Sequence, residues 1–326
     1  MPSIPIVDFE PCGIHHSFVA DVELKAVGDK TYEAFMDYGF VYLKNTGISS
    51  TSVDELNEVT EEFFSQPDDV KAKYFRKINN FGYDAIGKEK LVDGHPGDYK
   101  ESFNMTCGAT KNPDIVWPDD VVPEFSKTAK SFMKKCKALA LRVLDALSFG
   151  LNLENPTLLS TLHSSMLETN NGSSLRCLRY PPILKPLEKD QIRLAEHTDY
   201  GSLTLLFQDM VGGLQIKMRD GTYIDAVPIK DAILLNVADL LQYWTNGRLR
   251  STPHRILSPT EESQKLTIRR SVAFFVHPSE DLLVSRTLFN DNLSGNYTKL
   301  RGLTYDQLQQ LTVGEYLQTQ FHDTYA

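Results

Sequence analysis

The segment Leu203-Thr-Leu-Leu-Phe-Gln-Asp-Met-Val-Gly-Gly-Leu-Gln-Ile-Lys-Met218 decides the fold class, because it holds two short apolar or alternating runs separated by a glycine pair. Such runs are typical of β-strands, whose side chains alternate between two faces, and glycine pairs mark turns. Similar runs lie at Leu175–Tyr180, Thr222–Val227, Ala232–Val237, Ser251–Leu257 and Leu266–Val276. The favoured hairpin dipeptides Asp220-Gly221 and Asn246-Gly247 separate some of them. From about Ser174 onward we therefore predict a sandwich or jelly roll of roughly seven or eight strands.

Helices are expected to flank this β core. Four helices are expected, at 20–37, Ser50–Phe64, Pro123–Leu147 and Tyr305–Phe321, and apolar residues recur at helical spacing in Pro123–Leu147. Short strands are expected near Ile4 and Phe40. The fold class we predict is a mainly β core with flanking helices, arranged as a double-stranded β-helix. We divide the chain into a mostly helical region (1–170), the jelly-roll core (171–285) and a C-terminal helical segment (286–326), packed as one unit.

The composition argues against several classes of partner. The net charge is −9, from 34 basic and 43 acidic residues, which disfavours nucleic acids and anionic membranes because both are polyanions. The sequence contains no stretch of about 20 apolar residues and no basic leader, so we expect neither a membrane span nor a signal peptide. Its four scattered cysteines form no CxxC pair, which indicates reduced thiols. We expect a soluble, cytoplasmic monomer.

A candidate metal site lies in the β half, in Glu196-His-Thr-Asp-Tyr-Gly201. In an extended strand, His197 and Asp199 point to the same side and can bind one ion, although a strand-end His bonded to an Asp is an equal alternative. His254, in a later strand, favours the metal. Two imidazoles and one carboxylate leave three octahedral positions open, which is typical of iron(II) oxygenases rather than structural zinc. The other histidines are expected to be dispensable for metal binding: His15, His16, His95, His163, His277 and His322.

A candidate anion site lies in the strand Arg269-Arg-Ser-Val-Ala-Phe-Phe-Val276. With a period of two, Arg269 and Ser271 share one face of this strand. A planar guanidinium with a hydroxyl beside it is a good bidentate clamp for a carboxylate at the end of a pocket. The alternative is a strand-edge arginine whose head group reaches water.

Together, His197-x-Asp199, His254 and Arg269-x-Ser271 resemble the signature of the isopenicillin N synthase-like branch of the iron(II)/2-oxoglutarate-dependent dioxygenases, in its fungal and bacterial form. The resemblance covers nearly the whole chain. It includes Ile4–Phe9, Tyr38–Ile48 with Thr46 where His is usual, Asn236–Leu241 with Ala238 for the common Gly, and Gly314–Leu317. These departures lie outside the proposed metal and co-substrate positions.

The resemblance implies a dioxygenase that uses Fe(II), 2-oxoglutarate and O₂, with ascorbate as a candidate reductant. It also implies that Arg269 and Ser271 hold the 2-oxoglutarate, and that Tyr180 hydrogen-bonds either the 2-oxoglutarate or the substrate carboxylate. A small organic substrate would be hydroxylated, desaturated or cyclised, with release of succinate and CO₂. Two alternatives stay open: an iron oxidase that needs no 2-oxoglutarate, as isopenicillin N synthase is, and a catalytically silent jelly-roll binding protein.

Candidate substrate contacts follow from the strand Leu175–Tyr180. Arg176 shares a face with Tyr180, so both side chains would point into the barrel. A buried arginine needs an acceptor, and a polar atom of the substrate is a candidate. With Tyr200 and Phe275 as aromatic walls, the sequence predicts a small, flat or carboxylated substrate. The alternative is that Arg176 pairs with a structural acid such as Glu101.

Overall fold

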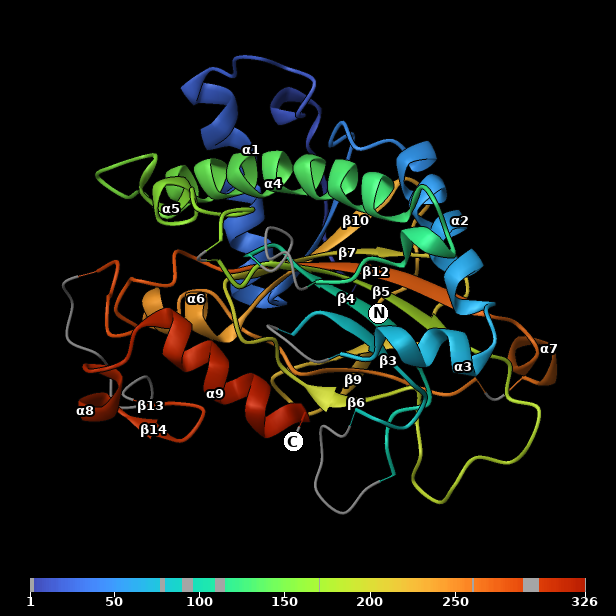
Figure 1. Cartoon of the computed structure of the whole chain (residues 1–326). Helices are drawn as coiled ribbons and strands as arrows, with labels where there is room; N and C mark the ends of the chain where they lie inside the picture. Colours follow the sequence, from blue (N-terminus) through green and yellow to red (C-terminus); the bar gives the residue numbers. More distant parts are fainter. Residues whose placement is uncertain are drawn as a thin grey trace.

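The chain folds into two β-sheets that face each other beneath a layer of helices (Figure 1). This computed structural model describes residues 3–76, 80–89, 96–108, 115–169, 171–259, 261–289 and 299–325. The large sheet has the order β1-β2-β10-β7-β12-β5-β4-β3, and the small sheet has the order β6-β11-β8-β9. Such facing sheets form a jelly roll, which leaves a cavity between them for a site.

The strands of the large sheet are β1 (Ile6–Asp8), β2 (Phe40–Lys44), β3 (Gly82–Asp84), β4 (Glu101–Thr106), β5 (Ser174–Tyr180), β7 (Leu203–Gln208), β10 (Ala232–Val237) and β12 (Arg269–Val276). The small sheet consists of β6 (Leu194–His197), β8 (Leu214–Lys217), β9 (Tyr223–Asp225) and β11 (His254–Ile256). A separate ribbon pairs β13 (Lys299–Leu300) with β14 (Leu303–Thr304).

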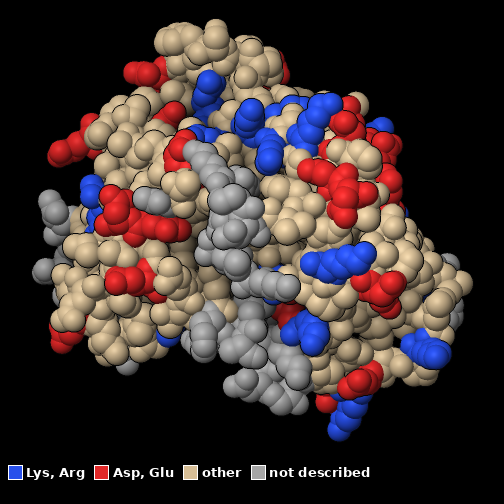
Figure 2. Space-filling view, viewed as in Figure 1, with Lys and Arg blue, Asp and Glu red and all other residues tan. Residues whose placement is uncertain are grey.

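The helices are α1 (Asp21–Asp37), α2 (Ser50–Phe64), α3 (Asp68–Lys71), α4 (Phe125–Gly150), α5 (Leu158–Leu162), α6 (Asp239–Trp244), α7 (Glu262–Lys265), α8 (Tyr305–Leu308) and α9 (Val313–Tyr325). In Figure 1, α4 lies across one face of the large sheet, with α1 packed against it. The two helices can touch because Gly28 meets Gly150, where an added side chain would collide with backbone. The exposed face of α4 carries lysines, which appear as the basic side chains gathered over this helix in Figure 2.

Alternation along the strands of the large sheet separates a helix side from a cavity side. In β12, Val272 and Phe274 join the core beneath the helices, whereas Arg269, Ser271, Ala273 and Phe275 face the small sheet. The antiparallel register with β5 places Arg269 opposite Tyr180. The same register places Ala273 opposite Arg176. The candidate co-substrate and substrate residues therefore lie on one face, at successive positions of two neighbouring strands.

The predicted β core with flanking helices is confirmed, but two local predictions are wrong and strand β4 was not predicted. Strand β4 (Glu101–Thr106) is buried and lies in the region expected to be mostly helical. Asn246-Gly247 ends α6 instead of joining two strands, with the Gly247 amide donating to the Gln242 carbonyl. The single helix expected over Tyr305–Phe321 is two helices, because Thr312 and Glu315 form a reciprocal capping box that starts α9.

The three-segment division of the chain stays a prediction. The large sheet crosses its first boundary, since β2 pairs with β10 and β4 pairs with β5. None of the described helices is both long and apolar enough to cross a membrane.

Candidate active site

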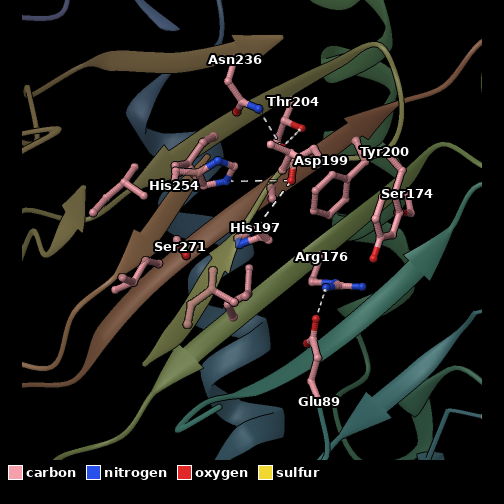
Figure 3. Close-up of a pocket in the computed structure, with 18 of the residues that line it drawn as sticks. Glu89, Ser174, Arg176, His197, Asp199, Tyr200, Thr204, Asn236, His254 and Ser271 are labelled. Carbon is pink, nitrogen blue, oxygen red and sulfur yellow. Dashed lines mark hydrogen bonds and ion pairs between the residues drawn. The ribbon is translucent and has the colours of Figure 1, made fainter. Parts of the chain in front are cut away.

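A cavity of about 920 Å³, counting its open mouth, lies between the two sheets (Figure 3). Its walls include His197, Asp199 and His254 on one side and Arg176 and Phe275 on another. Tyr180, Tyr200 and Ser271 also line it. The structure thus brings eight of the nine candidate residues to the lining of one cavity, and the ninth, Arg269, is fully buried against Tyr180.

Two histidines and one carboxylate converge at the centre of this cavity. Asp199 Oδ1 lies 3.6 Å from His197 Nε2 and 3.9 Å from His254 Nε2. The two imidazole rings are 4.3 Å apart, and the three ligand atoms all lie within 4.8 Å of one another. Strands β6 and β11 bring the histidines together, because His197 is paired directly with His254 in the small sheet. This arrangement can hold one metal ion.

Neighbouring groups orient each of these three side chains. The Nδ1 atoms of His197 and His254 lie 2.9 and 3.0 Å from the carbonyls of Ala195 and Thr252. Because a carbonyl only accepts, Nδ1 carries the proton and each Nε2 keeps its lone pair for a metal. On Asp199, Oδ2 accepts hydrogen bonds from Thr204 at 2.6 Å and from Asn236 at 2.7 Å. Oδ1 is therefore the oxygen that faces the histidines.

The electrostatics of the cluster favour metal binding. Burial, together with the neighbouring His254, lowers the pKa of His197 to about 4, which keeps its ring neutral. Burial alone would raise the pKa of Asp199, but the two histidines and the two hydrogen bonds lower it below its ordinary value. Two neutral imidazoles and an ionised carboxylate are the protonation states that a divalent ion requires.

We call the end of the cavity that Tyr180 and Ser271 line the closed end, and Arg269, which is completely buried, lies against these two residues. Its guanidinium donates to the Gly212 carbonyl at 2.8 Å, to Ser271 Oγ at 3.3 Å and to Gln208 Oε1 at 3.4 Å. All three acceptors are neutral. The guanidinium lies 4.8 Å from the centre of the Tyr180 ring, whose hydroxyl is buried without a hydrogen-bond partner.

A second buried arginine, Arg193, lies 6.0 Å from the same tyrosine ring. Its Nε has no hydrogen-bond partner, and its one described bond runs to the Thr267 carbonyl at 3.4 Å. Burial and the charge of Arg269 lower the pKa of Arg193. Among the described residues, neither arginine is ion-paired with a carboxylate. Two buried cations with no ion-paired carboxylate in the described part of the chain are costly, so this end of the cavity fits an anionic ligand.

On the wall formed by β4 and β5, the buried basic side chains are ion-paired with carboxylates. Arg176 lies over the Phe275 ring at 5.4 Å and donates to Glu89 at 3.2 Å and to Asn104 at 3.2 Å. Lys100 bridges Glu89 at 2.8 Å and Asp98 at 2.7 Å. We call Glu89, Asp98, Lys100 and Arg176 the buried ion network.

The buried ion network is balanced in charge, with two acids and two bases. Burial alone would raise the pKa of Glu89, but Lys100 and Arg176 lower it well below its ordinary value. The alternative that Arg176 pairs with Glu101 is wrong, because the acid that Arg176 pairs with is Glu89. Glu101 faces the helices instead, where it pairs with Arg179 at 2.9 Å and Lys71 at 3.0 Å.

The remaining histidines whose side chains the structure describes do not join the central cluster. His163 is buried and contacts Ser202 Oγ, while His277 lines the cavity with a pKa that burial and the neighbouring His163 lower to about 3. His15 and His16 lie on the surface beside Glu10. His95 and the side chain of His322 lie outside the described residues.

Two family profiles match the chain. The 2OG-Fe(II) oxygenase superfamily profile matches residues 170–278, which contain β5 to β12 and all three convergent ligands. The profile named non-haem dioxygenase in morphine synthesis N-terminal matches residues 4–124. This chain belongs to the 2OG-Fe(II) oxygenase superfamily.

Known relatives of the oxygenase include the 2-oxoglutarate-dependent dioxygenase htyE of Aspergillus rugulosus, 36% identical over 77% of this chain and 82% of the relative. The proline hydroxylase buaE of Petromyces alliaceus is 32% identical over 90% of this chain and 92% of the relative. Among solved structures, a full-length Neurospora crassa protein in complex with α-KG and thymine superposes with a TM-score of 0.79 at 28% identity, over 99% of this chain and 97% of that chain. The oxygenase therefore uses iron(II), 2-oxoglutarate and O₂ to oxidise a small molecule.

Sequence reasoning missed several residues around the site of this oxygenase. Arg193 and the acids of the buried ion network were not singled out. Arg301 was also missed, although its guanidinium donates to Asp239 at 2.6 Å and to the Thr198 carbonyl at 2.5 Å and covers the Tyr200 ring at 4.2 Å. It thereby ties the C-terminal segment to the loop that carries Asp199. A period of two counted back from His197 reaches Arg193, which is the signal that could have found it.

Proposed function

We propose that His197, Asp199 and His254 bind the iron(II) of this dioxygenase, and that Arg269, Ser271 and Tyr180 hold the distal carboxylate of 2-oxoglutarate. The observation that carries the proposal is the pairing, in one cavity, of a convergent two-histidine, one-carboxylate cluster with a closed end that holds buried positive charge and no carboxylate among the described residues. When bound, iron and 2-oxoglutarate would supply, with O₂ as the oxidant, the decarboxylation of 2-oxoglutarate to succinate and CO₂ and the oxidation of the substrate.

The residues of the chain supply orientation and electrostatics. The carbonyls of Ala195 and Thr252 fix the two imidazole rings, so that both Nε2 atoms face Asp199 Oδ1 without rearrangement. At the closed end, the planar guanidinium of Arg269 can donate two parallel N–H bonds to a carboxylate, and the Tyr180 hydroxyl can donate one more hydrogen bond. The apolar side chains Leu194, Leu206 and Leu214 line the cavity between these two places and exclude water.

For the substrate, we propose a small, flat and polar molecule that lies against Arg176, Tyr200 and Phe275. The buried ion network already neutralises Arg176, so this wall favours an uncharged polar group over the carboxylate that the sequence also allowed. Among the similar proteins, the one from Neurospora crassa binds thymine, a flat heterocycle, whereas buaE is named a proline hydroxylase. The Phe275 ring beneath the Arg176 guanidinium favours the flat class for this chain.

The proposal is tested by substrate-free succinate formation from 2-oxoglutarate with iron(II) and ascorbate. Wild-type protein should form succinate, whereas Asp199→Ala should not. Wild-type protein that leaves 2-oxoglutarate intact, but consumes O₂ with a substrate, would instead be an oxidase of the isopenicillin N synthase kind. A mass-spectrometric screen of flat heterocycles against amino acids, scored for the gain of one oxygen or the loss of two hydrogens, then identifies the substrate class.

A cytoplasmic location and a monomeric state, both expected from the sequence, stay predictions. Size-exclusion chromatography with light scattering tests the monomer, for which the expected mass is 36.8 kDa.

A further inference from the structure

A second group of metal-ligating side chains lies on the surface, in the segment between β1 and α1. Glu10, His15 and His16 form this group, which we call the surface cluster. Like the active-site triad, it consists of two histidines and one carboxylate whose ligand atoms all lie within 4.8 Å of one another. The side chains are 53%, 44% and 40% exposed, so an ion can reach them from solvent.

The distances within the surface cluster match the coordination shell of a small transition-metal ion. Glu10 Oε1 lies 3.2 Å from His15 Nε2 and 3.5 Å from His16 Nε2. Two ligand atoms that each lie about 2.0–2.1 Å from a tetrahedral zinc ion are about 3.3 Å apart, as the tetrahedral angle requires. An ion can therefore enter with small side-chain movements. The His16 Nε2, which lies 3.1 Å from the Glu10 carbonyl, would exchange its proton for the metal.

Backbone packing holds the first histidine of the cluster in place. A side chain added at Gly13 would come within 2.3 Å of the His15 ring, and one added at Gly47 would come within 3.0 Å of it. The ring therefore lies against the backbone at both glycines, in space that a Cβ atom would otherwise enter. Such a cradle reduces the side-chain entropy that a ligand must lose when it binds a metal.

The loop itself is also tied to the body of the protein. The Ile14 amide donates to the Thr46 carbonyl at 2.9 Å, next to β2. Arg142 of α4 donates to the carbonyls of Cys12 at 3.4 Å and His16 at 3.2 Å. The three ligands thus lie on a loop that the sheet and the longest described helix both hold, which favours a preformed site.

We propose that the surface cluster is a second divalent-metal site, separate from the active site, that takes a borderline-soft ion such as Zn²⁺. Imidazole nitrogens with one carboxylate oxygen suit zinc, and water can complete the shell. This departs from the expectation that His15 and His16 have no part in metal binding. An ion held there would cross-link the end of β1 to the entry of α1 and stabilise the folded state by mass action.

The test is calorimetric titration of Zn²⁺ alone into the metal-free, full-length protein. Wild type should bind two equivalents, whereas Glu10→Gln and His15→Ala should each bind one. Glu23→Gln, which removes an exposed acid from the start of α1, is the matched control and should bind two. His254→Ala should lose the other equivalent, and 2-oxoglutarate turnover with iron should be unchanged in Glu10→Gln.

A second measurement separates this site from the active site. Zn²⁺ should raise the melting temperature of His254→Ala but not that of the double variant His254→Ala/Glu10→Gln. The proposal is overturned if Glu10→Gln and His15→Ala bind as much Zn²⁺ as the wild type does, or if the double variant keeps the full thermal shift.

Discussion

Arg269 and Arg176 face the same cavity from neighbouring strands, but their surroundings differ. Both are buried, at 0% and 8% exposure. Every described acceptor around Arg269 is neutral, and a second cation, Arg193, lies on the same tyrosine ring. Arg176, by contrast, is ion-paired with Glu89 within the balanced buried ion network.

This difference indicates which kind of ligand each end of the cavity can bind. A buried cation without a carboxylate partner gains most from an anionic ligand, because the ligand removes an uncompensated charge. A cation that is already paired offers a directional donor without net charge, which suits a neutral polar group. We therefore propose the carboxylate of 2-oxoglutarate as the ligand of the closed end and an uncharged substrate as the ligand of the β4–β5 wall.

The largest effect is expected at the centre, between these two ends. His197→Ala, Asp199→Ala and His254→Ala should each reduce turnover below detection, because two remaining ligands hold iron weakly. Succinate formation and bound iron measure this, with Glu23→Gln as the control that keeps both. An alanine variant with near-native turnover would remove that residue from the ligand set.

The next largest effect is expected at Arg269. Arg269→Leu should raise the apparent KM for 2-oxoglutarate by roughly 10²–10³-fold, since breaking a buried charge pair costs about 3–5 kcal/mol. Ser271→Ala should have a smaller effect, because it removes one neutral hydroxyl. Arg270→Leu is the matched control, since Arg270 points to the helix side and pairs with Glu61 at 2.8 Å. Equal saturation curves for Arg269→Leu and Arg270→Leu would refute the co-substrate assignment.

On the other wall, Arg176→Ala should weaken the substrate instead of the co-substrate. Loss of a charged hydrogen bond costs about 1.5–3 kcal/mol, so substrate KM should rise roughly 10–100-fold while uncoupled 2-oxoglutarate turnover survives. Arg179→Ala, on the opposite face of β5, is the control, because Arg179 pairs with Glu61 and Glu101. If both activities fall together with a lower melting temperature, Arg176 is structural.

The smallest effect is expected at Arg193, whose positive charge we expect to strengthen 2-oxoglutarate binding at the closed end. Arg193→Met should raise KM for 2-oxoglutarate roughly tenfold, the size of effect that a unit charge roughly 10 Å away produces at an effective dielectric constant of about 20. The melting temperature without 2-oxoglutarate should not fall, since the substitution removes a buried charge that lacks a counter-ion among the described residues. Unchanged 2-oxoglutarate saturation would show that Arg193 plays no part at this end.

The fold was predictable where one face of each strand is apolar. The run Leu203–Gln208 shows its period in the sequence, and the structure keeps the predicted bounds. Strand β4 was not predictable, because Glu101 and Asn104 are polar yet buried. Their burial depends on distant partners, namely Lys71 and Arg179 for Glu101 and Arg176 for Asn104. The sequence around β4 contains no pattern that indicates these distant partners.

The site was predictable where the spacing of residues along a strand places two functional side chains on the same face. His197 and Asp199 are two residues apart along the chain, and Arg269 and Ser271 share one strand face. The buried ion network had no such signal. Its acids precede β4 in a segment with no periodicity, and only the folded chain places Glu89 beside Arg176.

The most direct test of the contrast between the two ends is anaerobic calorimetric titration of 2-oxoglutarate into the iron(II)-loaded protein. Wild type, Arg269→Leu and Arg176→Ala are compared. We expect Arg269→Leu to weaken 2-oxoglutarate binding by roughly 10²-fold or more, and Arg176→Ala to leave it at the wild-type value. Equal weakening in both variants, or none in Arg269→Leu, would contradict the assignment of the two ends to different ligands.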